Sequence, residues 1–172
     1  MQRPAIFLDR DGTLIVDQHY LRDPSLVVPL PFVFEALRSL HTCGFALVVV
    51  TNQSGIARGI IHPSEHEAVR AAFERTFERE GIRFDGYYMC PHAPGEGCAC
   101  RKPEPGMLHD ATRDLDLDLG RSVMVGDRES DMGAGKNAGC RTAFLGGTKP
   151  SFDYEGLVAT DWRDLVGHLL RL

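Results

Sequence analysis

Apolar segments of strand length alternate along the chain with segments of helical periodicity, and this alternation constrains the fold more than any other feature. The strand-like segments are rich in β-branched residues and span 5–8, 45–50, 84–89, 122–125 and 141–145. Parallel strands need crossover connections of about a dozen residues, which are usually helical. The pattern therefore predicts an α/β fold in a single domain over residues 1–172, with a central parallel sheet and helices on both faces.

A helical segment follows each predicted strand. The clearest spans 64–80, where Ser64 and Glu67 have the spacing of a capping box and Gly81 is a natural stop. Its apolar side chains recur every four residues, at Val69, Phe73 and Phe77. Further helices are predicted at 32–42, 107–115, 131–138 and 161–170.

The composition fits one globular domain and argues against some classes of binding partner. The 172 residues are 43% hydrophobic and 25% charged, enough for one core. The net charge of −5, without a dense Lys/Arg cluster, argues against a nucleic-acid partner. No apolar run approaches the ~20 residues of a membrane span, and the N-terminus lacks a signal-peptide pattern. We expect a cytoplasmic protein without membrane contact, and by default a monomer, because no coiled-coil pattern indicates a partner.

Polar clusters follow three of the predicted strands at the points where the strands end. They span 9–13 after the first strand, 51–55 after the second and 126–131 after the fourth. In open parallel sheets, ligands bind outside the carboxyl ends of the strands. We therefore expect the three clusters to meet at one edge of the sheet.

Four aspartates belong to these clusters. Taken alone, Asp9 and Asp11 are explained equally well as turn or capping residues. Together with Asp127 and Asp131 they would form a group that repels itself unless a hard cation binds it. Such oxygen ligands suit Mg²⁺, which takes one or two carboxylates together with water and phosphate oxygens. The pattern therefore predicts a site for magnesium and phosphate.

Three of the five cysteines lie in one loop with a histidine. The loop, residues 90–100, holds a set of soft ligands formed by Cys90, His92, Cys98 and Cys100. This set suits a closed tetrahedral Zn²⁺ site, and four protein ligands would make the zinc structural rather than catalytic. The alternative is free thiols beside a surface histidine. The two remaining cysteines, Cys43 and Cys140, are expected to be small buried hydrophobic residues.

The zinc loop runs directly into two cations, because Arg101 and Lys102 follow Cys100. Ordering the loop would fix both charges at the mouth of the site. We therefore expect zinc to preorganise phosphate-binding charge.

In their order along the chain, these clusters resemble the four motifs of the haloacid dehalogenase (HAD) superfamily, over nearly the whole sequence. The matching positions are Asp9-x-Asp11-Gly12-Thr13, Thr51, Lys102 and the segment from Gly126-Asp127 to Asp131. The resemblance implies a Rossmann-like fold and phosphatase chemistry. A chain of 172 residues has no room for the large cap domain of many HAD enzymes, so short loops would select the substrate.

The resemblance also implies the reacting groups. Asp9 would be the nucleophile that forms an aspartyl-phosphate. Asp11 would protonate the leaving alkoxide and then act as the base that activates water. Mg²⁺ would be held by Asp9, the main-chain carbonyl of Asp11, and Asp127.

Other matched residues would bind the phosphoryl group and the rest of the substrate. Thr51 would donate hydrogen bonds to the transferring phosphoryl group, Lys102 would offset its charge, and Asp131 would orient Lys102 or the metal shell. Arg101 is the leading candidate for binding a second phosphate. Further substrate contacts are implied at Asp17, Gln18, His19, Tyr20, Asn52, Gln53, Ser54 and Arg128, although His19 and Tyr20 are explained equally well by packing.

The zinc loop narrows the resemblance to one branch, the D,D-heptose 1,7-bisphosphate phosphatases and the related histidinol-phosphate phosphatases. Residues 90–103 match the Cys-x-His…Cys-x-Cys-Arg-Lys-Pro pattern of both, and 51–59 resembles the heptose side. The short interval between His92 and Cys98 also occurs in the histidinol-phosphate phosphatases. In addition, the sequence of residues 17–20 differs from the one most common in the heptose branch.

The branch implies a Mg²⁺-dependent phosphatase that removes the C7 phosphate of D-glycero-D-manno-heptose 1,7-bisphosphate. Its product, heptose 1-phosphate, would supply nucleotide-heptose for lipopolysaccharide and other cell-surface polysaccharides. Histidinol-phosphate hydrolysis is the alternative activity. A zinc-stabilised binding module without turnover is a remote alternative, because a pure binder has no chemical reason to keep Asp9 and Asp11 together.

Overall fold

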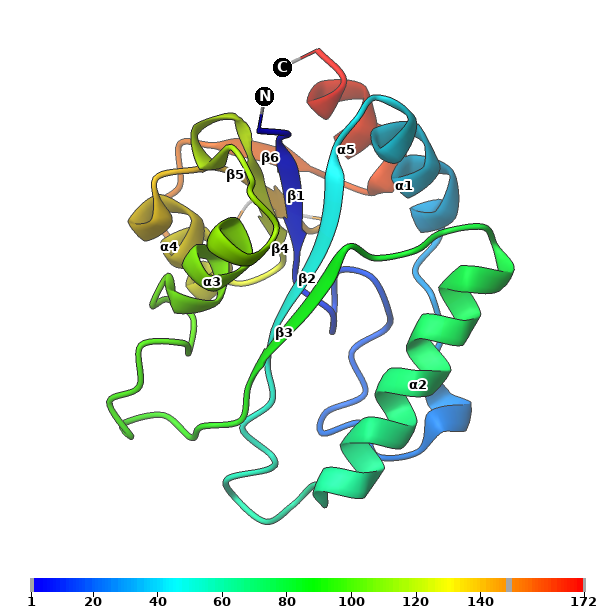
Figure 1. The fold of residues 1–172 in the computed structure, drawn as a ribbon, viewed down its shortest axis with the longest axis vertical. Helices are drawn as coiled ribbons and strands as arrows, with labels where there is room; N and C mark the ends of the chain where they lie inside the picture. Colours follow the sequence, from blue (N-terminus) through cyan, green and yellow to red (C-terminus); the bar gives the residue numbers. More distant parts are fainter. Residues whose placement is uncertain (1, 148–149, 172) are drawn as a thin grey trace.

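The computed structural model describes residues 2–147 and 150–171. Its single sheet has six parallel strands in the order β3-β2-β1-β4-β5-β6 (Figure 1). The strands are β1 (Ala5–Leu8), β2 (Ala46–Asn52), β3 (Gly86–Cys90), β4 (Val123–Gly126), β5 (Arg141–Leu145) and β6 (Leu157–Ala159). The five predicted strands are confirmed, with ends that move by two residues or fewer. The sequence pattern does not predict β6, because three residues are too few to establish a period.

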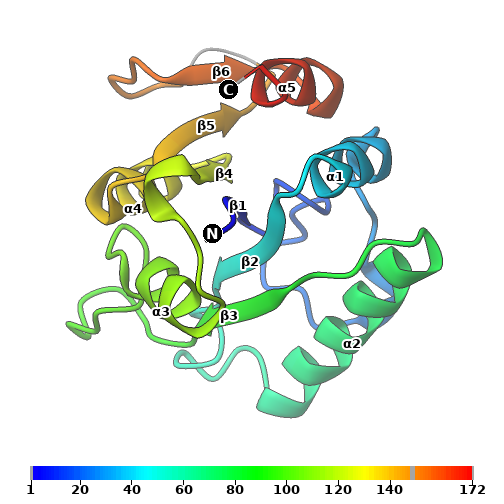
Figure 2. The same ribbon diagram turned by 45° about the horizontal axis from the view of Figure 1, so that its top comes forward.

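Helices cover both faces of the sheet, as predicted. They are α1 (Val33–Thr42), α2 (Pro63–Arg79), α3 (Gly106–Asp114), α4 (Glu129–Ala138) and α5 (Trp162–Leu169). Helices α1, α2 and α5 pack on one face, and α3 and α4 pack on the other (Figure 2). None of these helices, within the described ranges, is long and apolar enough to cross a membrane.

The packing of the central strand β1 explains why its sequence is an unbroken apolar run. Ile6 and Leu8 pack into the core with α1, α2 and α5, whereas Ala5 and Phe7 pack into the core with α3 and α4. A strand of a parallel sheet that is buried on both faces has no solvent-facing positions. The β1 segment therefore lacks the alternation of polar and apolar residues seen in half-buried strands.

The start of α2 differs from its prediction. The cap is His62, whose ring Nδ1 accepts a hydrogen bond from the Ser64 main-chain N–H at 3.3 Å. The carboxylate of Glu65 accepts the His62 main-chain N–H at 2.8 Å. The predicted capping box of Ser64 and Glu67 is therefore wrong by two residues, because Pro63 already fits the first helical position. The buried positions 69, 73 and 77 are confirmed.

One cysteine prediction is confirmed and one is wrong. Cys140 is buried, and its thiol donates a hydrogen bond to the Gly135 carbonyl at 3.5 Å. Cys43 is exposed because it follows α1 directly and lies at the open end of that helix, ahead of the turn at Gly44.

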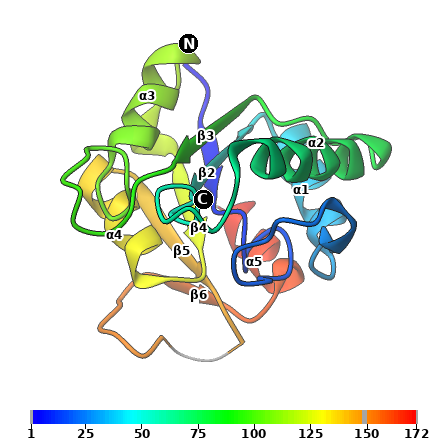
Figure 3. The same cartoon turned by 90° about the horizontal axis from the view of Figure 1, so that it is seen from below.

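Three loops gather at the carboxyl ends of the strands, as the view from below shows (Figure 3). They span 9–32 after β1, 53–62 after β2 and 91–105 after β3. Within the described ranges no further domain is inserted between the strands. These loops therefore form the walls of the cleft at that edge, as expected for a fold without a large cap.

Candidate active site

The central strands bring the three polar clusters to one place. Asp9 directly follows β1, Thr51 lies at the end of β2 and Asp127 directly follows β4. Above them is an open cleft of about 240 Å³. Many of the predicted residues line it, namely Asp9, Asp11, Asp17, His19, Tyr20, Asn52, Gln53, Ser54, Arg101 and Arg128. Gln18 does not line this cleft, and instead faces a neighbouring hollow beside Arg22.

Lys102 is buried at the base of this cleft between two carboxylates. Its Nζ lies 2.6 Å from Asp9 Oδ1 and 2.7 Å from Asp131 Oδ1, and it donates a third bond to the Val50 carbonyl at 2.8 Å. Burial works to lower the pKa of Lys102, but the charges of Asp131 and Asp9 raise it above its ordinary value. Lys102 is therefore held as a cation, in contact with the predicted nucleophile.

The carboxylates around Lys102 carry more negative charge than one lysine can balance. Burial raises the pKa of Asp9 to about 8, against the opposing charge of Lys102. Burial, followed by the charge of Asp131, raises the pKa of Asp127 to about 6. The protein chain alone therefore disfavours full ionisation of this group, as expected for buried carboxylates that lie close to one another.

The same carboxylates fit a magnesium ion. Asp9, Asp127 and Asp131 each offer an oxygen, and these atoms all lie within 4.8 Å of one another. Asp127 Oδ1 is buried without a hydrogen-bond partner among the described residues. The Asp131 carboxylate already pairs with Lys102 and accepts a hydrogen bond from the Arg128 main-chain N–H. These contacts are those expected of a residue that orients Lys102. Asp127 therefore has the free, buried oxygen that a hard cation would occupy.

Gly12 lets the chain turn beside this group. Its φ of +85° lies in the left-handed region, and a Cβ there would overlap the Asp127 carboxylate. Glycine meets both demands, because it adopts positive φ freely and has no side chain.

Asp11 lines the same cleft. Arg10 holds it through Nε and Nη2 at 2.8–3.2 Å, and Gln53 Nε2 donates to its Oδ2 at 2.8 Å. Gln53 also donates to Thr51 Oγ1 at 2.9 Å. The Gln53 amide, predicted to contact substrate, thus joins Asp11 to Thr51 in this structure.

Sequence reasoning did not single out Arg10. Side chains alternate along extended chain, so Arg10 follows Ile6 and Leu8 toward the apolar core while Asp9 and Asp11 face the cleft. A cation at a core-facing position directly after a buried strand is the signal that could have identified it.

Asn52 also has a structural task. Its side chain exchanges two hydrogen bonds of 3.1 Å with the main chain of Lys102. This pair fixes the end of β2 to the segment that supplies the buried ammonium group.

Charged and polar residues form the rim of the cleft. Arg128 Nη2 lies 2.7 Å from Asp17 Oδ2, and the other Asp17 oxygen accepts the His19 main-chain N–H at 2.9 Å. His19 and Tyr20 have φ of 51° and 58°, in the left-handed region. Arg101 donates to the His92 carbonyl at 3.1 Å, which connects the rim to the cysteine loop.

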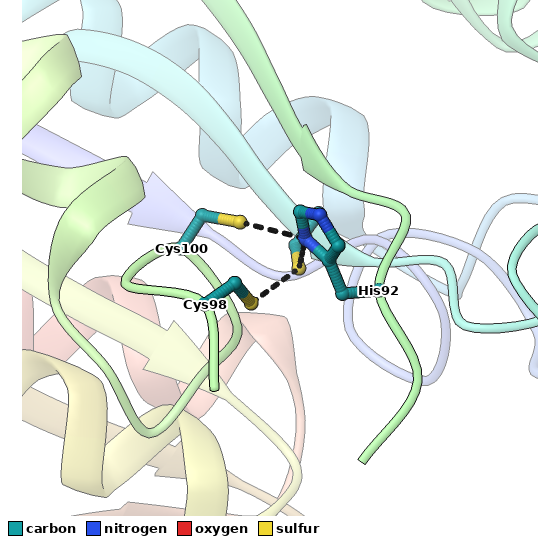
Figure 4. Close-up of side chains that lie close together, drawn as sticks. His92, Cys98 and Cys100 are labelled. Atoms are coloured by element: carbon teal, nitrogen blue, oxygen red, sulfur yellow. Dashed lines mark hydrogen bonds between the residues drawn. The ribbon is translucent and has the colours of Figure 1, made fainter. Parts of the chain in front are cut away.

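The four predicted zinc ligands come together, as Figure 4 shows for the three that it labels. Cys90 Sγ lies 3.4 Å from His92 Nδ1 and 3.7 Å from Cys98 Sγ, and Cys100 Sγ lies 3.3 Å from His92 Nδ1. Tetrahedral zinc with Zn–S of about 2.3 Å and Zn–N of about 2.0–2.1 Å would separate its ligands by roughly 3.5–3.8 Å. The residues therefore fit a closed tetrahedral site.

The thiols of this cluster are unequal. Burial raises the pKa of Cys90 well above its ordinary value. Burial also acts to raise that of Cys98, but hydrogen bonds from the main-chain N–H of Arg101 and from neighbouring thiols lower the Cys98 pKa to about 7.

Comparisons with known proteins agree on one family. The HAD-hydrolase-like family model matches residues 99–153. D-glycero-beta-D-manno-heptose-1,7-bisphosphate 7-phosphatase of Vibrio cholerae is 40% identical, over 100% of this chain and 99% of the relative. The protein of the same name from Escherichia coli K12 is 42% identical, over 92% of this chain and 87% of the relative.

A solved structure supports the same assignment. D,D-heptose 1,7-bisphosphate phosphatase from B. bronchiseptica, complexed with magnesium and phosphate, superimposes with a TM-score of 0.87 at 32% identity and covers 99% of both chains. The likeness thus extends over nearly the whole of both chains. From this full-length similarity, the chain belongs to the heptose-1,7-bisphosphate 7-phosphatase family of HAD-like hydrolases.

Proposed function

We propose that this protein is a Mg²⁺-dependent phosphatase that hydrolyses the C7 phosphate of D-glycero-β-D-manno-heptose 1,7-bisphosphate and releases heptose 1-phosphate. This proposal rests on the convergence of Asp9, Asp11 and Lys102 at a cleft whose rim holds Arg101 and Arg128. The relatives from Vibrio cholerae and Escherichia coli K12 carry the β-anomer in their names and match nearly the whole chain.

Asp9 is the nucleophile in this proposal. Its oxygen attacks phosphorus, the bond from phosphorus to the C7 oxygen breaks, and Asp11 gives the leaving oxygen a proton. Asp11 then takes a proton from water, which hydrolyses the aspartyl-phosphate and regenerates both residues. Thr51 donates a hydrogen bond to the transferring group, and Lys102 offsets its charge.

Magnesium would be held by Asp9, the main-chain carbonyl of Asp11, and Asp127. When bound, it would neutralise the carboxylates and the phosphoryl oxygens. Asp131 keeps Lys102 directed at Asp9, consistent with its 2.7 Å contact.

Zinc at Cys90, His92, Cys98 and Cys100 would be structural. Four protein ligands leave no open position for catalysis. The loop would hold Arg101 at the rim through its bond to the His92 carbonyl. Zinc would in this way fix a cation that binds phosphate.

The second phosphate of the substrate needs a site away from Asp9. We assign the C1 phosphate to Arg101, whose guanidinium can bind two phosphate oxygens at once. Hydrogen bonds to the sugar would come from the remaining predicted rim residues, Asp17, His19, Tyr20, Ser54 and Arg128. A location in the cytoplasm and a monomeric state remain predictions.

A substrate profile tests the proposed activity. We expect kcat/KM for the β-anomer of heptose 1,7-bisphosphate to exceed that for the α-anomer and, by a larger factor, that for histidinol phosphate at fixed Mg²⁺. The Asp9→Asn variant should lose essentially all turnover, because an amide cannot form the aspartyl-phosphate. A preference for histidinol phosphate would refute the assigned substrate, and hydrolysis unchanged in Asp9→Asn would refute the mechanism.

A further inference from the structure

Arg10 is a buried cation in the first motif to which the proposed chemistry gives no role. Its side chain is 1% exposed, on the core side of the chain. Within the described ranges, Asp11 is the carboxylate that lies within 4.0 Å of the guanidinium, at 2.8 Å. Burying an ion costs several kcal/mol unless it is paired and hydrogen-bonded. Arg10 and Asp11 therefore form one unit that links the core to the cleft.

The contacts hold the Asp11 carboxylate in one orientation. Its Oδ2 accepts the two shortest bonds, each 2.8 Å, from Arg10 Nη2 and Gln53 Nε2. Its Oδ1 accepts only longer bonds of 3.1 and 3.2 Å, both from Arg10. The Asp11 side chain is 21% exposed and lines the cleft. Oδ1 is thus the oxygen with capacity left for a proton exchanged with a ligand.

Arg10 is itself held in place from a second element. Its Nη1 donates to the Tyr87 hydroxyl of β3 at 3.3 Å, so the guanidinium cannot rotate without losing that bond. The guanidinium of Arg70 on α2 lies over the Tyr87 ring, 4.5 Å from its centre, whereas the hydrogen bonds to the Asp11 carboxylate come from Arg10 and Gln53. Apart from Gln53, which lines the cleft, the residues that set the orientation of Asp11 are Arg10 and Tyr87, and neither of these lines the cleft.

We infer that Arg10 is a positioning residue for the proton transfers of Asp11, an inference that rests on the proposed function. As the Asp9–phosphorus bond forms and the phosphorus–oxygen bond breaks, Asp11 gives its proton to the leaving alkoxide. The carboxylate left behind is paired with Arg10 and oriented by Gln53. In the second step this carboxylate takes the proton of the attacking water, and the cycle closes without any other reactant.

Leaving-group dependence separates this role from a structural one. An alkoxide leaves only when it is protonated, whereas the p-nitrophenolate of p-nitrophenyl phosphate leaves without a proton. Because kcat/KM reports steps up to the first irreversible one, hydrolysis of the aspartyl-phosphate does not enter the comparison. Loss of positioning should therefore lower kcat/KM for the sugar phosphate selectively.

The central test is Arg10→Lys, which keeps the charge but not the planar two-donor geometry. We expect kcat/KM for heptose bisphosphate to fall on the order of 10²-fold, and that for p-nitrophenyl phosphate by less than about tenfold. Asp11→Asn should show the same selectivity with a larger loss. The matched control Arg70→Met should leave the ratio of the two values unchanged.

Equal losses on the two substrates would show that Arg10 only supports the fold, and unchanged values on both would also overturn the inference. If Arg10→Lys does not fold, Gln53→Leu and Tyr87→Phe replace it, and absence of a selective loss in both overturns the inference. Failure of the wild-type protein to hydrolyse heptose bisphosphate counts against the proposed function instead. The variants are compared only once that wild-type turnover is established.

Discussion

Lys102 Nζ lies 2.6 Å from Asp9 Oδ1, although the two residues are 93 positions apart in the chain. The pair is buried, and Asp131 Oδ1 lies 2.7 Å from the same nitrogen. One cation therefore serves two buried carboxylates. Its removal must affect stability and chemistry together.

We predict that Lys102→Met lowers the free energy of unfolding by about 3–5 kcal/mol in magnesium-free buffer, because two buried carboxylates lose their counter-charge. It should also lower kcat on the order of 10²-fold or more. Denaturant unfolding and steady-state kinetics measure the two effects. The double variant Lys102→Met/Asp131→Asn should regain part of the stability but not the activity, and a double variant no more stable than the single one would contradict this account.

Asp127 gives a prediction for magnesium. Asp127→Asn removes a carboxylate whose ionisation burial disfavours, so stability without magnesium should stay equal or increase. Mg²⁺ should raise the melting temperature of the wild-type protein, since ligands that bind only the folded state stabilise it. The variant should lose this magnesium-dependent rise and most activity.

An exposed aspartate provides the control for this experiment. Asp153→Asn should keep the full response to magnesium, because Asp153 lies outside the cleft. An equal rise in melting temperature for Asp127→Asn would exclude Asp127 as a ligand.

The fold was predictable because the apolar runs that form buried parallel strands are long enough to recognise. The convergence of Asp9, Thr51 and Asp127 followed from topology alone, since carboxyl ends of parallel strands share an edge. What the sequence could not supply is the direction of side chains. Asn52 and Gln53 belong to a motif that implies substrate contact, and the folded structure shows in addition that their amides bond to Lys102 and Asp11.

The start of α2 differs from its prediction for a local reason. The cap of α2 is His62, whose imidazole nitrogen accepts the hydrogen bond for which the capping rule expects a serine oxygen.

Gly12 and Gly81 form a matched pair for testing the turn after β1. Both have positive φ, +85° and +76°, but a Cβ at Gly81 meets nothing within 4 Å. We predict that Gly81→Ala costs about 1–2 kcal/mol of stability and leaves kcat unchanged. Gly12→Ala should in addition displace Asp127 and abolish the response to magnesium. Equal activity in the two variants would show that strain at the turn, rather than the approach to Asp127, determines the effect.

Zinc should stabilise the cysteine loop. We predict that Cys98→Ser lowers the bound zinc, the melting temperature and kcat/KM for the bisphosphate, because structural zinc contributes directly to folding. Metal analysis and thermal unfolding measure this. Cys43→Ser, at an exposed cysteine outside the cluster, should change none of them. A protein that keeps both fold and activity after a chelator has stripped its zinc would disprove a role for the metal.

We expect the buried His66 to make the stability of the protein sensitive to acid. It is 2% exposed on α2, and its Nε2 has no hydrogen-bond partner within the described part of the chain. The charged groups around it are Arg10 and Asp11 after β1, and Glu67 and Arg70 on its own helix, while the Tyr87 ring of β3 lies 6.4 Å away. Burial, followed by the charge of Arg10, lowers the pKa of His66 below its ordinary value of 6.5.

The sign of the effect follows from linkage. Above the unfolded pKa of about 6.5 both states are neutral and the contribution of His66 to stability is complete. As pH falls below that value, the unfolded chain binds a proton that the folded protein resists, so stability is lost down to the folded pKa. We predict that His66→Gln loses less free energy of unfolding than the wild-type protein between about pH 7.5 and pH 5.5. His41→Gln, at an exposed position, should follow the wild-type protein, and identical losses in all three proteins would show that His66 does not set this sensitivity.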